Sequence, residues 1–256
     1  MTHSQPDILR STIQLLNDGI TIPAYMAQPR TIEKQEGTIP AIIVLQEIFG
    51  VNNHIRDITD RIAQLGYVAI APALYERLAP NFETGYTAES ITIGREYKQQ
   101  TKADELLGDI QATINYLNTH PSVNPNAIGC IGFCFGGHVA YLAATLPTVN
   151  VTASFYGAGI TTWCPGQDEP TISQTAKIQG TLYGFFGMED QSIPPHQVEE
   201  LEQTLEQHKV SHRLFRYPGA GHGFFCDQRK SYNAKAAADA WSHVQALFQT
   251  LKTEKI

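Results

Sequence analysis

Gly132-Phe133-Cys134-Phe135-Gly136-Gly137 is the stretch of sequence that decides the fold. It follows an apolar run at 128–131 and precedes an apolar helical pattern at 139–144, so Cys134 stands at a predicted strand-to-helix turn. Glycine two positions before and after a nucleophile is typical of this turn, because larger side chains would collide with the neighbouring strand and helix. The alternative interpretation is a small buried thiol on a glycine-rich turn. We interpret Cys134 as a nucleophile, in the position where serine is commoner.

Apolar runs recur along the chain and predict a mostly parallel sheet. The expected strands are Ala41–Leu45, Tyr67–Ala71, Ile128–Gly132, Val151–Phe155, Leu182–Phe186 and Arg213–Tyr217, and the expected helices between or after them are Ile55–Leu65, Leu106–Leu117, Val198–Leu205 and Ala234–Leu251. Asn53 is expected to cap the first of these helices. Alternating strands and helices indicate βαβ units with helices on both faces of the sheet.

An antiparallel hairpin is expected at the amino-terminal end of the sheet. The alternating runs Thr12–Leu16 and Ile20–Tyr25 flank Asn17-Asp18-Gly19, a turn signal. The chain of 256 residues shows no internal repeat and no linker, so one α/β domain over residues 1–256 is expected.

Composition points to a protein that acts on a small molecule. Apolar residues make up 42% of the chain, charged residues 17%, and the net charge is −7 without any basic run, which argues against nucleic acid or an anionic membrane as partner. The first seven residues, Met1–Asp7, have no basic or apolar targeting pattern. We therefore expect a cytoplasmic protein that is a monomer or a weak homodimer.

No metal and no cofactor are expected. The four cysteines lack paired C-x-x-C spacing, and no H-E-x-x-H or H-x-H pattern occurs. Cys226 is interpreted as an inert packing thiol, Cys164 as a loop residue and Cys130 as a buried strand residue. A metal-dependent enzyme is thus the least favoured class.

The partners of Cys134 are expected just after strands, where ligands bind in such sheets. His222 lies in a glycine-rich loop beyond the last strand, and Asp190 follows the strand before it. His138 and Glu189 are the respective rivals. A nucleophile, acid, histidine order is that of α/β-hydrolases. The backbone N–H groups of Phe135 and Ile48 are expected to form the oxyanion hole. The predicted fold class is therefore the α/β-hydrolase fold.

The sequence resembles the dienelactone hydrolases, also called carboxymethylenebutenolidases. The resemblance rests on Gln46-Glu47-Ile48-Phe49-Gly50, Pro72-Ala73-Leu74-Tyr75-Glu76-Arg77, the turn at 132–137, the segment that ends in Asp190, and Ala220-Gly221-His222-Gly223-Phe224. It implies a Cys134, Asp190, His222 triad that cleaves an enol-lactone. It also implies that Glu47 helps to control the protonation of the thiol and that Arg77 holds a substrate carboxylate.

One position departs from the family pattern. The family's best-known branch has a second substrate-binding arginine four residues after the histidine, and Cys226 stands there in this chain. Arg229 is a candidate substitute, and Phe49 and Tyr156 are expected to line the substrate pocket. The resemblance predicts hydrolysis of a small ester or lactone that carries a carboxylate. The alternatives are a general carboxylesterase or thioesterase, and a ligand-binding protein of the same fold that has no activity.

Overall fold

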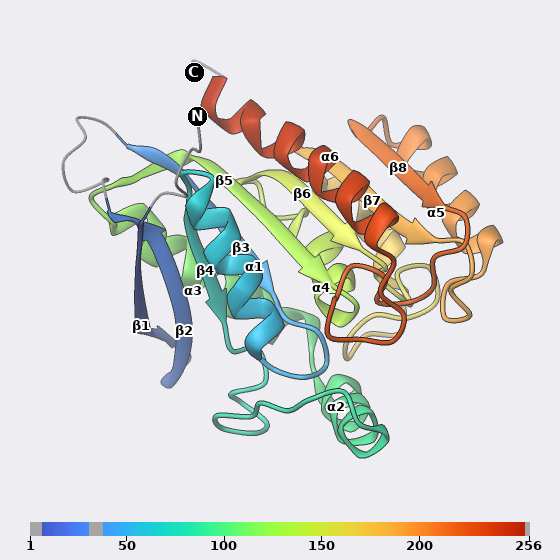
Figure 1. Ribbon diagram of the computed structural model, residues 1–256, viewed down its shortest axis with the longest axis horizontal. Coiled ribbons are helices and arrows are strands. Elements are labelled where there is room, and N and C mark those ends of the chain that lie inside the picture. The colour runs from blue at the N-terminus through green and yellow to red at the C-terminus, as the bar shows by residue number, and fades with distance from the viewer. Residues whose placement is uncertain (1–6, 31–37, 254–256) are drawn as a thin grey trace.

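The computed structural model describes residues 7–30 and 38–253, and its eight strands form one sheet (Figure 1). The strand order is β1-β2-β4-β3-β5-β6-β7-β8. The strands are β1 (Ile8–Asn17), β2 (Ile20–Pro29), β3 (Ile39–Leu45), β4 (Val68–Pro72), β5 (Val123–Phe133), β6 (Val149–Phe155), β7 (Thr181–Gly187) and β8 (His212–Tyr217). From β4 to β8 all neighbouring strands in this order are parallel, which confirms the prediction of a mostly parallel sheet.

The expected amino-terminal hairpin is also present. β1 pairs antiparallel with β2, and β2 pairs antiparallel with β4, which attaches the hairpin to the parallel strands. Asp18 and Gly19 make the turn with φ angles of 49° and 75°. Glycine and aspartate tolerate this left-handed backbone better than most residues, so the local sequence explains the turn.

Helices cover both faces of the sheet. They are α1 (Asn53–Gln64), α2 (Ala88–Gln100), α3 (Ala103–Thr119), α4 (Phe135–Ala143), α5 (Pro195–Gln207) and α6 (Ala234–Thr253), with a short 3₁₀ segment, η2 (Thr171–Lys177). Figure 1 shows α1 and α6 on one face and α3 and α4 on the other. None of the helices in the described ranges is long and apolar enough to cross a membrane. Residues 1–6, on which the expectation about targeting rests, lie outside these ranges.

The core forms because each strand and helix presents apolar residues at its own period. Every residue of the run Ala41–Leu45 is fully buried, since β3 lies in the sheet interior with helices on both sides. In α1 the residues Ile55, Ile58 and Ile62 are fully buried, as expected for an amphipathic helix. The cap of α1 is Asn52 and not Asn53, because the Asn52 side chain accepts a hydrogen bond from the Ile55 N–H.

Helix α2 was not predicted, and it lies beyond the carboxyl ends of the parallel strands (Figure 1). Thr87 caps it by accepting a hydrogen bond from the Ser90 N–H. Gly94 allows it to approach the loop after β3, because a Cβ at this position would overlap the Ile48 carbonyl oxygen. The sheet therefore ends under a helix on the side where a ligand would bind.

Candidate active site

Cys134 lies on a strained turn between β5 and α4. Its φ and ψ angles are 55° and −115°, an unfavourable conformation for a residue with a Cβ. A Cβ on Gly132 would overlap the Gly136 carbonyl oxygen, and one on Gly136 would overlap the Leu45 carbonyl oxygen. The flanking glycines therefore have the steric role expected from the sequence, and they hold the partly exposed thiol at the first turn of α4.

His222 and Asp190 are brought together at the same end of the sheet. The His222 Nδ1 lies 2.7 Å from Asp190 Oδ2. The other carboxylate oxygen of Asp190 accepts the Ser192 N–H at 2.8 Å, and only 4% of the residue is exposed, so the carboxylate is fixed. Glu189, the rival acid, is exposed, and the carboxylate that contacts His222 is that of Asp190. Asp190 thus orients the His222 ring and leaves Nε2 for another partner.

The charges of Cys134 and His222 stabilise each other. Desolvation opposes the thiolate, but the neighbouring His222 outweighs this effect, so the pKa of Cys134 lies below its ordinary value. Desolvation also opposes the imidazolium, yet the Cys134 charge and the hydrogen bond to Asp190 raise the pKa of His222 to about 10. Both shifts favour the thiolate and the imidazolium, which together are the reactive form of a cysteine nucleophile.

A cavity of about 230 Å³ opens directly on Cys134 and His222. Its walls include the predicted residues Ile48, Phe49 and Phe135. A second cavity of about 480 Å³ lies next to it and shares Phe49 and His222 as wall residues. Phe135 is the first residue of α4, where backbone N–H groups have no helical partner, and Ile48 lies opposite on the loop after β3.

Three cationic side chains line the cavity beside Cys134, and no carboxylate is among its wall residues in the described chain. Arg95 and Lys98 come from α2, and Arg229 comes from the loop after His222. The Lys98 Nζ lies 4.7 Å from the centre of the Trp163 ring, and burial lowers the Lys98 pKa. The sequence had indicated only Arg229. The cavity is positive although the chain as a whole carries a charge of −7.

Glu47 is fully buried next to this cavity and has two partners. Its Oε1 accepts a hydrogen bond from Arg229 Nη1 at 2.9 Å, and its Oε2 accepts one from the Tyr86 hydroxyl at 3.2 Å. The Glu47 charge raises the pKa of Cys134 and the Arg229 charge lowers it. The two charges therefore have opposite effects on the thiol, and the role of Glu47 in controlling its protonation stays a prediction.

Arg77 does not reach the cavity. Its guanidinium binds Asp109 on α3, with Nη2 at 2.6 Å from Asp109 Oδ1, and it also donates to the Asn17 carbonyl oxygen at 3.4 Å. A carboxylate that is 2% exposed holds the arginine there. Arg77 was predicted to bind a substrate carboxylate, but in the structure it links the β1–β2 turn to α3 and lies outside the walls of the cavity at Cys134.

Tyr156 and His138 lie behind the cavity wall. The Tyr156 ring packs edge-to-face on His222, with ring centres 5.2 Å apart, and Tyr156 is fully buried. The expected pocket residue Tyr156 thus supports the histidine and is not a wall residue of the cavity. His138 lies 2.7 Å from the Thr171 hydroxyl through Nε2, and burial lowers its pKa to about 4. It contacts η2 and takes no part in the site.

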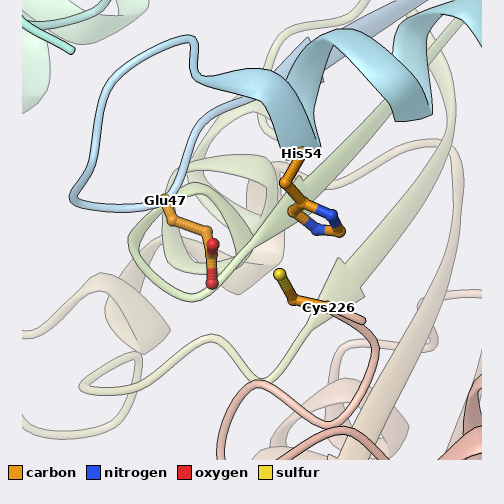
Figure 2. Close-up of side chains that lie close together, drawn as sticks. All are labelled: Glu47, His54 and Cys226. Carbon is orange, nitrogen blue, oxygen red and sulfur yellow. The ribbon is translucent and has the colours of Figure 1, made fainter. Parts of the chain in front are cut away.

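Potential metal ligands also gather near the site. Glu47, His54 and Cys226 are all buried, and one ligand atom from each lies within 4.8 Å of the others (Figure 2). The Cys226 thiol donates a hydrogen bond to the Tyr86 hydroxyl at 3.3 Å. Cys226 therefore lies in a polar cluster, whereas the sequence had suggested a simple packing thiol.

Known proteins resemble this chain in sequence and in fold. The model of the dienelactone hydrolase family matches residues 22–252. A relative from Synechocystis sp., whose name places it among the carboxymethylenebutenolidases, is 58% identical over 95% of this chain and 98% of its own. A Bradyrhizobium sp. relative named for 2-oxo-3-(5-oxofuran-2-ylidene)propanoate lactonase is 32% identical, over 86% of each chain.

A solved structure from Klebsiella pneumoniae, named for the dienelactone hydrolases, superimposes with a TM-score of 0.86 at 30% identity. The superposition covers 95% of this chain and 99% of that one. The α/β-hydrolase fold predicted from the sequence is confirmed by this match.

Proposed function

The chain belongs to the dienelactone hydrolase family, whose members are hydrolases of esters and lactones, and from this premise we propose that it opens a carboxylate-bearing enol-lactone through a thiol ester on Cys134. The observation that carries the proposal is the 2.7 Å contact of His222 with Asp190 beside a cysteine on a strained turn. Each of the three side chains then has one role in a two-step hydrolysis.

In the first step the Cys134 thiolate attacks the lactone carbonyl carbon. The oxygen becomes negative and accepts hydrogen bonds from the Phe135 and Ile48 N–H groups. When the intermediate collapses, the ring C–O bond breaks, and the enolate oxygen takes a proton from the His222 imidazolium. The acyl chain now carries a thiol ester at one end and an enol at the other, which rearranges to a ketone.

In the second step His222, now neutral, takes a proton from water as the water oxygen attacks the thiol ester. The carbon–sulfur bond breaks, Cys134 leaves as a thiolate, and His222 regains its charge. The net reaction adds one water to the lactone and gives a keto acid. Asp190 keeps the imidazole ring oriented and stabilises its positive form in both steps.

The cations of the cavity favour a substrate with a carboxylate. No carboxylate acts on the Lys98 charge among the described residues, and Lys98 lies near enough to Cys134 for the two charges to interact. Arg95 lies on the same face of α2. A substrate carboxylate would neutralise the positive charges of Lys98 and Arg95 and would compete with Glu47 for Arg229. We assign Lys98, Arg95 and Arg229 to substrate binding in place of Arg77.

The test is hydrolysis of dienelactone beside p-nitrophenyl acetate by the wild type and by Cys134→Ala. We expect lactone turnover to fall by about a thousandfold or more in the variant, because the nucleophile is gone. Cys164→Ala, at a buried loop cysteine, is the matched control and should remain active. Turnover of the activated ester alone would identify a general cysteine esterase, and full activity of Cys134→Ala would refute the proposal.

A further inference from the structure

A second group of reactive side chains lies behind the proposed active site. Glu47 follows β3, His54 lies in the first turn of α1, and Cys226 lies in the loop after His222. One carboxylate oxygen, one ring nitrogen and the sulfur lie within 4.8 Å of one another, and all three residues are buried. Figure 2 shows the three side chains directed toward a common point from three separate segments.

The His54 ring offers the clearest sign that a ligand is missing. His54 is 2% exposed, and its Nε2 is buried without a hydrogen-bond partner among the described residues. Figure 2 shows this ring turned toward Cys226. Buried polar atoms normally have a partner, so an unpaired imidazole nitrogen is costly.

We propose that Glu47, His54 and Cys226 bind a divalent transition-metal ion of the zinc type. Thiolate, imidazole and carboxylate are the ligand classes that Zn²⁺ accepts, and three protein ligands leave a fourth position for water. The Cys226 thiol loses its proton to solvent as the ion binds. One ion of charge +2, one carboxylate and one thiolate then give a neutral centre.

The geometry requires only small movements. Ligand atoms around tetrahedral Zn²⁺ are about 3.3 to 3.8 Å apart, so atoms within 4.8 Å would close by about 1 Å. Glu47 keeps its Oε1 bond to Arg229, whereas Oε2 exchanges the Tyr86 hydroxyl for the ion. The same exchange releases Cys226 from Tyr86. The site therefore forms from side chains that are already adjacent.

One of the three proposed ligands, His54, also lines a separate cavity. A cavity of about 320 Å³ has His54 in its wall, together with the carboxylates of Asp57 and Asp227. Arg61 lines the same cavity and opposes a cation, but the two carboxylates outnumber it. Cys134 is not in this wall, so the cavity beside His54 differs from the one that opens on the nucleophile.

The test is titration of the chelator-treated full chain with Co²⁺ under anaerobic conditions. We expect one ion per chain, with the visible bands of a tetrahedral site, a thiolate-to-cobalt charge-transfer band, and displacement by Zn²⁺. Cys226→Ser should abolish the charge-transfer band, and His54→Gln should weaken binding by at least about tenfold. Cys164→Ser is the matched cysteine control, and Cys134→Ser separates this site from the nucleophile. Both should keep the band.

The result has two clear readings. Loss of the band in Cys226→Ser and its retention in Cys134→Ser supports the proposal, provided that circular dichroism shows both variants folded. If Cys226→Ser does not fold, His54→Gln gives the same test through affinity. Binding that depends on Cys134, or no stoichiometric binding by the folded wild type, overturns the site. The hydrolase proposal is tested separately, by the loss of lactone turnover in Cys134→Ala, and its chemical steps use neither His54 nor Cys226.

Discussion

Arg77 and Arg229 are two arginines in similar settings with different uses. Their side chains are 11% and 17% exposed, and each donates to a buried carboxylate, Asp109 for Arg77 and Glu47 for Arg229. Burial and pairing therefore do not distinguish them. What differs is the opposite side of each guanidinium. Arg77 faces the β1–β2 turn, whereas Arg229 lines the cavity that contains Cys134. The proposed role of each arginine therefore depends on what its guanidinium faces besides its carboxylate partner.

The largest expected effect is on stability at Arg77. Arg77→Met leaves Asp109 buried without its cation, so the free energy of unfolding should fall by about 3 to 5 kcal/mol. Urea denaturation followed by circular dichroism measures it. The double variant Arg77→Met, Asp109→Leu should recover much of the loss, since it removes both charges. A folded Arg77→Met variant with wild-type stability would contradict the structural role assigned to Arg77.

The next effect is on catalysis at Arg229. Arg229→Met should lower kcat/KM for dienelactone by about 100-fold, because a charged hydrogen bond to the substrate carboxylate is lost. Each variant leaves a buried carboxylate without its cation, so both are assayed where they are folded, and Arg77→Met should stay within about twofold of the wild type. Steady-state kinetics on both variants decide the matter. Equal losses in the two variants would contradict the separation of roles.

Lys98 lines the same cavity as Arg229 and offers a further test of substrate binding. Lys98→Met keeps much of the chain length but removes the charge, so KM for dienelactone should rise about tenfold. The neutral ester p-nitrophenyl acetate has no carboxylate, and its turnover should be unchanged. Lys102→Met is a matched control, because Lys102 lies outside this cavity and pairs with Glu105. A similar change with both substrates would show that Lys98 acts on structure.

The smallest effect concerns the pH dependence of the thiol. The Arg229 charge lowers the pKa of Cys134 and the Glu47 charge raises it. Arg229→Met should therefore move the acid limb of alkylation by iodoacetamide to higher pH, and Glu47→Gln should move it to lower pH. Arg77→Met should leave the limb in place. Shifts of the same sign in Arg229→Met and Glu47→Gln would contradict the assigned fields.

Most of the sheet and the catalytic cluster could be predicted because their signals are local. Glycine at 132 and 136 marks the strained turn, and polar residues just after strands mark the carboxyl edge of a parallel sheet. Asp190 and His222 were named on that basis and Glu47 from the family resemblance, and the structure places all three at the Cys134 end of the sheet. Their catalytic roles remain predictions.

Helix α2 escaped prediction because its sequence carries a weak helical signal. Only Ser90 and Gly94 of its thirteen residues are buried, so the sequence has no apolar stripe that would predict a helix here. Thr87, which can cap a helix, was the available clue. Gly94 would ordinarily argue against a helix, but it is needed where α2 meets Ile48. Lys98 was missed for the same reason.

The direction of a side chain is the second thing that sequence position could not supply. Arg77 and Cys226 were both placed correctly along the chain, after β4 and after His222. Their partners come from distant segments, Asp109 on α3 and Tyr86 before α2. Only the folded chain decides which of several nearby groups such a residue contacts. Pairings across 32 and 140 positions leave no local signal.

We propose that Cys134 carries the acyl group during turnover, and peptide mapping can detect that group on the cysteine itself. The enzyme is mixed with p-nitrophenyl acetate, quenched in acid within the first turnovers, digested and analysed by mass spectrometry. We predict an acetyl group on the peptide that contains Cys134, and its accumulation in His222→Ala at high pH, where the thiolate forms but water is not activated. An acetyl group on Cys226, or none on Cys134 during active turnover, would contradict the account.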